Sequence, residues 1–257
     1  MNSRGSVWGV LTARMRSSRL PGKAMAPLAG RPLLEHLMER LLSVRELAGW
    51  VLATSRAFEN QVLLDLAGRM GMKAFAGDEE DVLGRHLAAA ERFGAEHVVR
   101  VTGDNPLTDL GLIRRLTALH LESGADYTYV PGDALLMGIL PEVISRRALE
   151  ISHREGEDRH RSELTTLYIK ENPGRFQIRR AELPEELNRP AYRLTVDEPE
   201  DLELMNRIFE RLYRAGELLE TAEAIRLLEA EPELARINAH LRHKAANYRS
   251  VELDKVP

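Results

Sequence analysis

The chain has 257 residues, 44% of them hydrophobic, and a formal net charge of −4 from 36 basic and 40 acidic side chains. This length and apolar content can fill the core of one large α/β domain, and the near balance of charge excludes a global field that would recruit nucleic acid or an anionic membrane. Cysteine is absent, which excludes disulfides, thiolate metal sites and cysteine nucleophiles.

Apolar runs in the sequence stay below the roughly 18 residues of a membrane span, and no secretory signal is recognisable. We therefore expect a soluble, cytoplasmic protein that does not associate with a membrane. Aromatic residues make up only 5% of the chain, so little stacking surface is available for nucleic acid.

The first half of the chain alternates short apolar runs with segments of helical periodicity. Residues 6–12 predict a buried strand that leads into a polar loop, and apolar residues at helical spacing predict a helix over 32–44. Further strands are predicted at 50–55, 73–77, 97–103 and 126–130, and further helices at 59–70, 80–93 and 109–122. This alternation predicts an α/β fold with a mostly parallel, doubly wound sheet flanked by helices.

After residue 130 the pattern is less regular. Residues 131–145 predict a loop and an irregular strand. The remaining predictions are helices at 145–153, 158–171 and 199–215, strands at 175–183 and 191–196, and a helical stretch over 219–247 that breaks at Pro232.

The loop after the first predicted strand is strongly basic. The first 34 residues contain no acidic side chain and six basic ones, namely Arg4, Arg14, Arg16, Arg19, Lys23 and Arg31. Ligands of an open parallel sheet bind beyond the carboxyl ends of the strands. We therefore expect a negatively charged ligand at this loop.

Acidic side chains follow other predicted strands. Asp104 lies in "TGDNP" and Asp197 in "TVDEPEDLE". Each alone is equally typical of a turn or a helix N-cap, but both opposite a basic loop favour a phosphate chain bound with a divalent cation. Neither G-x-G-x-x-G nor G-x-x-x-x-G-K-[ST] occurs, which excludes a standard dinucleotide site or P-loop. His153 and His160 lack helical ligand spacing, which disfavours zinc.

Four motifs, taken in order, point to a known family. They are "ARMRSSRLPGK", "GDEEDVLGRH", "RVTGDNPL" and "LTVDEPEDLEL". Together they resemble the cytidylyltransferase family that includes CMP-Kdo and CMP-sialate synthetases and SpsF-like proteins of spore-coat polysaccharide biosynthesis, and the first motif is similar to the family signature A-R-x-x-S-x-R-L-P-G-K. The resemblance spans roughly residues 6–215.

This resemblance implies a Rossmann-like nucleotidyltransferase fold of the glycosyltransferase-A type. The expected organisation is a nucleotidyltransferase domain over residues 1–215 and a C-terminal helical extension over 216–257 packed on it. The implied reaction transfers CMP from CTP to a small polar acceptor, uses Mg²⁺, releases pyrophosphate and yields an activated sugar for polysaccharide biosynthesis.

The resemblance also implies roles for individual residues. Arg14 and Lys23, with Arg19 nearby, would hold the triphosphate, while Leu11 and Ala13 would line the base pocket through their backbone. The other implied nucleotide contacts are Thr54, Ser55, Arg85, Thr102, Gly103 and Asp104. Asp104 and Asp197 would bind Mg²⁺, and the implied catalytic set is Arg14, Lys23, Asp104 and Asp197. Candidate acceptor contacts are Gly138, Glu142, Arg159, His160 and Arg161.

Three functions stay open at this point. The first is an Mg²⁺-dependent cytidylyltransferase acting on a sugar acid or related acceptor. The second is a nucleotidyltransferase that uses a phosphorylated acceptor or another NTP to make an NDP-product, and the third is an inactive nucleotide-binding or scaffold protein. Intact Arg14, Lys23, Asp104 and Asp197 favour an enzyme. Apolar faces on the helices at 199–215 and 219–230 predict a homodimer.

Overall fold

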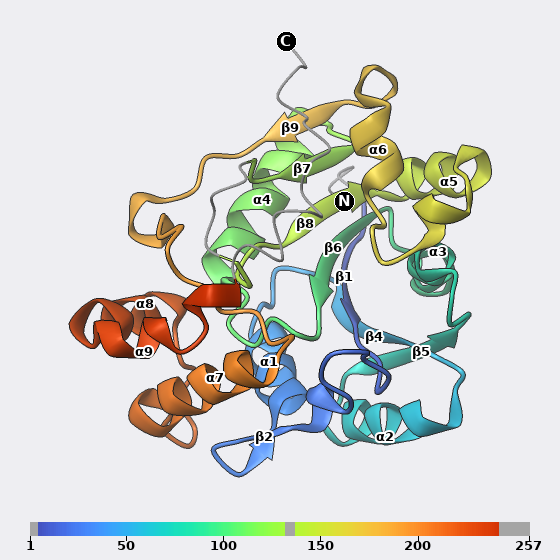
Figure 1. Cartoon of the computed structure of the whole chain (residues 1–257). Coiled ribbons are helices and arrows are strands. Elements are labelled where there is room, and N and C mark those ends of the chain that lie inside the picture. Colours follow the sequence, from blue (N-terminus) through green and yellow to red (C-terminus); the bar gives the residue numbers. More distant parts are fainter. Residues whose placement is uncertain (1–4, 132–136, 242–257) are drawn as a thin grey trace.

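A seven-stranded sheet forms the centre of the computed structural model, which describes residues 5–131 and 137–241 (Figure 1). The strand order is β5-β4-β1-β6-β8-β7-β9. The strands are β1 (Val7–Thr12), β4 (Gly49–Ser55), β5 (Lys73–Gly77), β6 (His97–Thr102), β7 (Tyr127–Tyr129), β8 (Glu142–Ser145) and β9 (Ile178–Arg180). β8 is antiparallel to β6 and β7, whereas the other pairings in the sheet are parallel. The predicted mostly parallel sheet is therefore confirmed.

Helices cover both faces of this sheet. They are α1 (Leu33–Leu42), α2 (Gln61–Arg69), α3 (Val82–Phe93), α4 (Leu110–Ser123), α5 (Arg146–Glu155), α6 (Leu167–Glu171), α7 (Pro199–Leu212), α8 (Thr221–Ala230) and α9 (Pro232–Arg236). A short antiparallel pair, β2 (Pro27–Leu28) with β3 (Arg31–Pro32), lies between β1 and α1.

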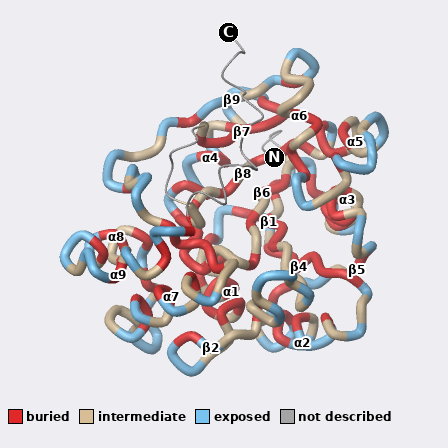
Figure 2. The backbone as a smooth tube through the Cα atoms, viewed as in Figure 1, coloured by how far each residue is buried: buried red, intermediate tan, exposed pale blue. Residues whose placement is uncertain are grey.

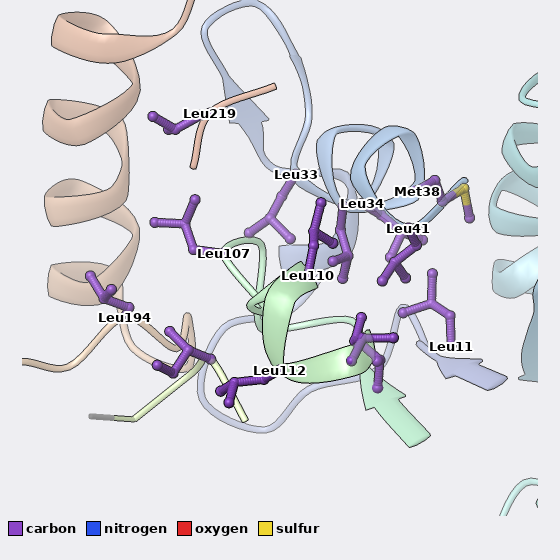
Figure 3. Packing of buried hydrophobic residues seen from close by; sticks show 14 of the residues in the cluster. Leu11, Leu33, Leu34, Met38, Leu41, Leu107, Leu110, Leu112, Leu194 and Leu219 are labelled. Atoms are coloured by element: carbon purple, nitrogen blue, oxygen red, sulfur yellow. The ribbon is translucent and has the colours of Figure 1, made fainter. Parts of the chain in front are cut away.

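Two apolar cores follow from the alternation of side chains along the strands. In β1, Leu11 packs into a core with α1, α2, α4, α7 and α8, whereas Val10 packs on the opposite face with α3, α5 and α6. Figure 3 shows part of the first core, where Leu33, Leu110 and Leu219 come from distant parts of the chain. Figure 2 shows the buried residues concentrated along the central strands. The sheet is thus the middle layer between two layers of helices.

Local sequence sets the ends of the helices that follow the strands. The side chains of Asp81, Asp109 and Ser145 accept hydrogen bonds from the backbone N–H of the third residue along, and so cap α3, α4 and α5. Gly94 and Gly124 end α3 and α4 in the left-handed conformation that glycine adopts at low cost. The caps of α3 and α4 follow parallel strands and lie at the carboxyl edge of the sheet, whereas Ser145 follows the antiparallel β8 and lies beside His97 at the start of β6.

Two predicted elements are wrong. The helix expected over 158–171 is a 3-10 turn at Asp158–Arg161, a turn, and then the short α6. Side-chain hydrogen bonds compete with the helix there, since the Ser162 hydroxyl donates to the Arg159 carbonyl and accepts from the Leu164 N–H. The strand expected over 191–196 makes only one isolated bridge, between Met137 and Arg193. Within this segment the N–H groups of Leu194 and Val196 donate to the carbonyls of Met137 and Asp104, which lie in loops.

The C-terminal helical stretch breaks between α8 and α9, directly before Pro232, as predicted. The part of the prediction over 242–247, the loop residues 132–136 and Arg4 lie outside the described residues. Apolar residues of α7 and α8, such as Ile208, Phe209 and Ile225, belong to the first core. The apolar faces on which the homodimer prediction rested are therefore covered within one chain.

A helix long and apolar enough to cross a membrane does not occur in the described part of the chain.

Two fully buried histidines make stability sensitive to acid. Burial lowers the pKa of both His86 and His120 to about 3, against an ordinary value of 6.5. Between these pH values the unfolded chain binds a proton that the folded chain does not. The histidines therefore stabilise the fold fully above pH 6.5, and this stabilisation is lost progressively as the pH falls toward 3.

We expect the free energy of unfolding in urea to fall between pH 7.5 and pH 5.0, by up to about 1.4 kcal/mol per pH unit for each histidine. In His120→Asn the fall should be less steep, because one of the protons taken up on unfolding is lost. Equal unfolding free energies at the two pH values in the unsubstituted protein would contradict the expectation.

Candidate active site

The carboxyl ends of β1 and β6 lie side by side. Thr12 and Thr102 are register partners, and the Gly103 N–H donates a 2.7 Å hydrogen bond to the Thr12 carbonyl. A Cβ on Gly103 would lie 2.7 Å from the Cβ of Ala13, so only glycine allows this close approach. Residues 13–32, which we call the basic loop, therefore begin in contact with the "TGDNP" segment.

Lys23 joins two carboxylates that are far apart in the sequence. Its Nζ lies 3.0 Å from Asp104 Oδ2 and 2.8 Å from Asp197 Oδ1. Exposed fractions of 15%, 26% and 14% for these three side chains mean that water screens them only partly. The structure thus brings together the basic loop, the end of β6 and the start of α7 at one point.

The charges at this point reinforce one another. Burial lowers the pKa of Lys23, but the charges of Asp104 and Asp197 outweigh burial and raise this pKa above its ordinary value. Burial likewise raises the pKa of Asp104, while the Lys23 charge and a hydrogen bond from Thr102 outweigh it and lower this pKa. Lys23 and Asp104 are therefore an ionised pair at neutral pH.

A tight turn presents Lys23 to the carboxylates. Gly22, at φ 73°, precedes the 3-10 turn Lys23–Met25, and its N–H donates to the Met15 carbonyl at 2.9 Å. The Met15 N–H in turn donates to Asn60 Oδ1 at 2.7 Å, and Asn60 Nδ2 donates to Ser55 Oγ. The basic loop is therefore closed on itself and tied to the end of β4. Asn60 was not among the predicted site residues, since it falls inside the helix predicted over 59–70.

Other cations of the basic loop also pair with acids. The pairs are Arg14 with Glu163, Arg16 with Glu59 and Glu79, Arg19 with Asp197 and Glu198, and Arg31 with Glu35 and Glu39. Arg19 therefore joins the Lys23 site, with its guanidinium 3.0 Å from Asp197. Arg31 lies apart from it, against α1 and Tyr213 at the end of α7.

The remaining predicted nucleotide contacts differ in their burial and in their hydrogen-bond partners. Leu11 is fully buried, which is compatible with its predicted contact through the backbone. The hydroxyls of Thr54 and Ser55 are enclosed at the end of β4, and Ser55 supports the basic loop through Asn60. Arg85 is buried and donates to the Asp78 carbonyl at 2.7 Å. Burial lowers the pKa of Arg85, and the nearby Arg14 charge lowers it further.

The predicted acceptor contacts fall into separate groups. Gly138, at φ 96°, packs so closely that a Cβ would lie 2.3 Å from the Thr195 N atom, so it positions the segment before Asp197. Arg159 and His160 both bond Glu171, while Arg161 pairs with Asp158. The structure does not bring these groups to one point.

Glu142 lies in a charged cluster of its own at the start of β8. It accepts hydrogen bonds from Arg100 at 2.8 Å and from the Tyr127 hydroxyl, and Lys170 lies 3.5 Å away. Burial raises the pKa of Glu142, but the charges of Lys170 and Arg100 outweigh it and lower the pKa to about 2. Since β8 is antiparallel to β6, this end of β8 lies toward the edge that carries Thr102.

Sequence reasoning missed three buried polar residues behind Asp197. They are Arg193, Asp201 and Asn238. Asp201 lies within the quoted motif "TVDEPEDLE", but an acid in the first turn of a helix is commonplace and does not mark a site. Nothing local in the sequence relates Asn238 to Asp201, 37 residues earlier.

The donor set fits Mg²⁺. Among the residues that the structure describes, no group of three or more His, Asp or Glu side chains could hold a metal ion unaided. Asp104 and Asp197 nevertheless direct one oxygen each toward a shared point, where the Lys23 ammonium now lies. Mg²⁺ is commonly held by one or two carboxylates, with phosphate oxygens and water completing its shell. The two aspartates would therefore suffice for a cation that arrives with a triphosphate.

Comparison with known proteins gives a consistent result. A family model described as cytidylyltransferase matches residues 9–231. The spore coat polysaccharide biosynthesis protein SpsF of Bacillus subtilis is 34% identical over 236 residues, which cover 88% of this chain and 95% of that protein.

Two solved structures resemble the fold. A cytidylyltransferase from Leptospira borgpetersenii aligns with a TM-score of 0.82 at 25% identity, covering 90% of this chain and 97% of that one. A CMP-2-keto-3-deoxy-manno-octonic acid synthetase solved with CTP aligns with a TM-score of 0.63 at 19% identity, covering 80% and 99%, and at that identity the likeness concerns the fold alone. The predicted nucleotidyltransferase fold is confirmed.

Proposed function

The chain belongs to the cytidylyltransferase family, and from that premise we propose that it transfers CMP from CTP to a sugar acid or a related polar acceptor, with Mg²⁺ and with release of pyrophosphate. The observation that carries the proposal is the approach of Lys23 to Asp104 and Asp197 at the carboxyl edge of the sheet. This is where an open α/β sheet binds its ligands, and one cation beside two carboxylates suits a triphosphate with its metal.

In the proposed reaction an acceptor oxygen attacks the α-phosphorus of CTP in line. The bond from that phosphorus to pyrophosphate breaks, and the acceptor proton passes to solvent. Negative charge grows on the departing pyrophosphate, so cations fixed there stabilise the transition state more than the ground state. Lys23 is assigned to this leaving group, with Arg14 and Arg19 holding the triphosphate beside it.

Bound Mg²⁺ would supply positive charge at the α-phosphate and lower the pKa of the acceptor oxygen. Asp104 and Asp197 are the proposed ligands. Two side chains orient these carboxylates. Thr102 donates to Oδ1 of Asp104 at 2.7 Å, and Arg193 donates to Oδ2 of Asp197 at 3.2 Å. Each carboxylate is thereby oriented with one oxygen left for ligation. A histidine base is not required in this scheme.

The acceptor side of the proposal lies along β8. Glu142, with Arg100 and Lys170, offers charged groups near the active edge. Gly138 is assigned to shaping the segment before Asp197, and Arg159, His160 and Arg161 stay proposed acceptor contacts. A cytoplasmic location and a homodimer are also part of the proposal, and sedimentation in solution would test the second.

Product analysis tests the function directly. We expect pyrophosphate release with CTP, Mg²⁺ and a suitable sugar acid, much slower release with ATP, GTP or UTP, and a product that carries a single phosphate by mass spectrometry. The control omits the acceptor. A product with two phosphates, formed from a phosphorylated acceptor, would replace the proposal by the NDP-product alternative. CTP binding without pyrophosphate release from any acceptor would favour an inactive nucleotide-binding protein.

A further inference from the structure

Asp201 is the centre of a buried hydrogen-bond network. Its side chain is fully buried and accepts from Arg193 Nε at 2.8 Å, Arg193 Nη2 at 2.9 Å and Asn238 Nδ2 at 2.8 Å. It also accepts from the backbone N–H groups of Asp197 and Glu198, both at 3.0 Å. A carboxylate offers about four lone-pair sites, so Asp201 is saturated. The buried Asp201 carboxylate therefore fixes the backbone at Asp197 and Glu198.

Arg193 carries this restraint to the Asp197 side chain. Its guanidinium is 3% exposed and bonds Asp201 through two nitrogens, and the Nη2 atom also lies 3.2 Å from Asp197 Oδ2. The planar, forked guanidinium allows these contacts only in one orientation. Asp197 Oδ2 is thus bound to a buried guanidinium that two contacts with Asp201 hold in place.

The other oxygen of Asp197 has different partners. Oδ1 contacts Lys23 and Arg19, both from the basic loop, and the Arg19 side chain is 50% exposed. Oδ1 therefore contacts cations of the basic loop, which are more exposed than the buried Arg193 on Oδ2. We call the Oδ1 side of the carboxylate the open side and the Oδ2 side the fixed side. The open side faces the point shared with Asp104.

Asn238 links the network to the chain beyond α9. Its side chain is 1% exposed, and Nδ2 donates to the Arg193 carbonyl at 3.0 Å as well as to Asp201. The segment that contains Asn238 thereby joins the network through both Arg193 and Asp201.

We propose that Arg193 and Asn238 are positioning residues, which through Asp201 fix Asp197 in the orientation that binds the metal–CTP complex. The inference rests on the proposed function. It extends the site from the conspicuous motifs to residues near the end of the described chain. It also gives the C-terminal segment a part in binding the metal.

Isothermal titration with CTP, without acceptor, tests the proposal apart from turnover. CTP affinity is measured with EDTA and with Mg²⁺, and the ratio of the two affinities is the enhancement by the metal. Partners that orient a ligating carboxylate typically contribute roughly 10- to 100-fold in metal affinity or activity. We expect Arg193→Met to lose that part of the enhancement, with CTP affinity in EDTA nearly unchanged. Arg193→Lys should lose nearly as much, since an ammonium cannot make the forked contact.

Arg40→Met is the matched control. Arg40 is equally buried, at 2% exposed, and bonds the Thr108 carbonyl and Thr221 between α1 and α8, away from Asp197. It should keep the enhancement, because Arg40 bonds Thr108 and Thr221 rather than Asp197 or Asp201. If Arg193→Met also keeps it, the positioning role is overturned and Arg193 is structural.

Asn238→Ala keeps the test open if Arg193→Met fails to fold. We expect Asn238→Ala to lose less of the metal enhancement than Arg193→Met does. An unchanged ratio of CTP affinity with metal to CTP affinity in EDTA would overturn the proposal. A wild-type protein whose CTP affinity does not respond to metal would overturn the metal part of the proposed function, and the positioning inference with it. This failure of the proposed function is distinguishable from failure of the positioning inference alone, because it is seen in the wild-type protein.

Discussion

Asn in place of Asp104 or Asp197 is expected to abolish measurable pyrophosphate release while the protein remains folded. Each substitution keeps the shape of the side chain and removes one negative charge from the point that Lys23 now occupies. Loss of one preorganised electrostatic contact costs on the order of 10²- to 10³-fold in rate. Here the loss should be larger, because the proposed metal would be left with a single carboxylate.

The fold should tolerate both changes because the ion pairing is shared. Without the Asp104 charge Lys23 still contacts Asp197, and without the Asp197 charge it still contacts Asp104. Circular dichroism and thermal melting check this, and Asp65→Asn at an exposed position of α2 is the control for a lost surface charge. Near-normal activity in either active-site variant would refute the assignment of the pair as metal ligands.

The fold was largely predictable because its signals are local. Apolar runs and helical periodicity mark β1, β4, β5, β6 and α1 to α4, and their order alone indicates parallel pairing. The short antiparallel pair β2 and β3 was not predicted. The predictions over 158–171 and 191–196 were wrong for a common reason. Both segments take their hydrogen bonds from side chains or from loops distant in sequence, as when the Val196 N–H donates to the Asp104 carbonyl. Neither helical nor strand periodicity carries that information.

The same distinction runs through the candidate site. Lys23, Asp104 and Asp197 follow predicted elements in motifs that resemble a family, so they could be grouped before any coordinates were known. Arg193 and Asn238 could not, because their importance comes from burial against Asp201 and not from their type or spacing. Thr54 and Ser55, which the resemblance implies as nucleotide contacts, are fully buried at the end of β4. Their burial, and the hydrogen bond from Asn60 to Ser55, could not be predicted from residue type.

Lys23→Met is expected to lower kcat by on the order of 10²- to 10³-fold, because the variant loses the cation assigned to the departing pyrophosphate. Methionine keeps much of the length and apolar volume of the lysine stem. It leaves Asp104 and Asp197 without the ammonium that lies within 3.0 Å of both. The pKa of Asp104 should therefore rise from its lowered value, since the Lys23 charge is the largest cause that lowers it. Single-turnover pyrophosphate release measures the chemical step.

Lys23→Arg separates charge from geometry in this prediction. The guanidinium keeps the charge but is broader than a compact ammonium, so it should recover only part of the rate lost in Lys23→Met. Lys73→Met, on the exposed start of β5, is the control for losing a lysine elsewhere and should turn over normally. If Lys23→Met retained the wild-type rate of pyrophosphate release, Lys23 would serve only to balance the two carboxylates in the free protein, and the leaving-group charge would have to be met by Arg14 and Arg19.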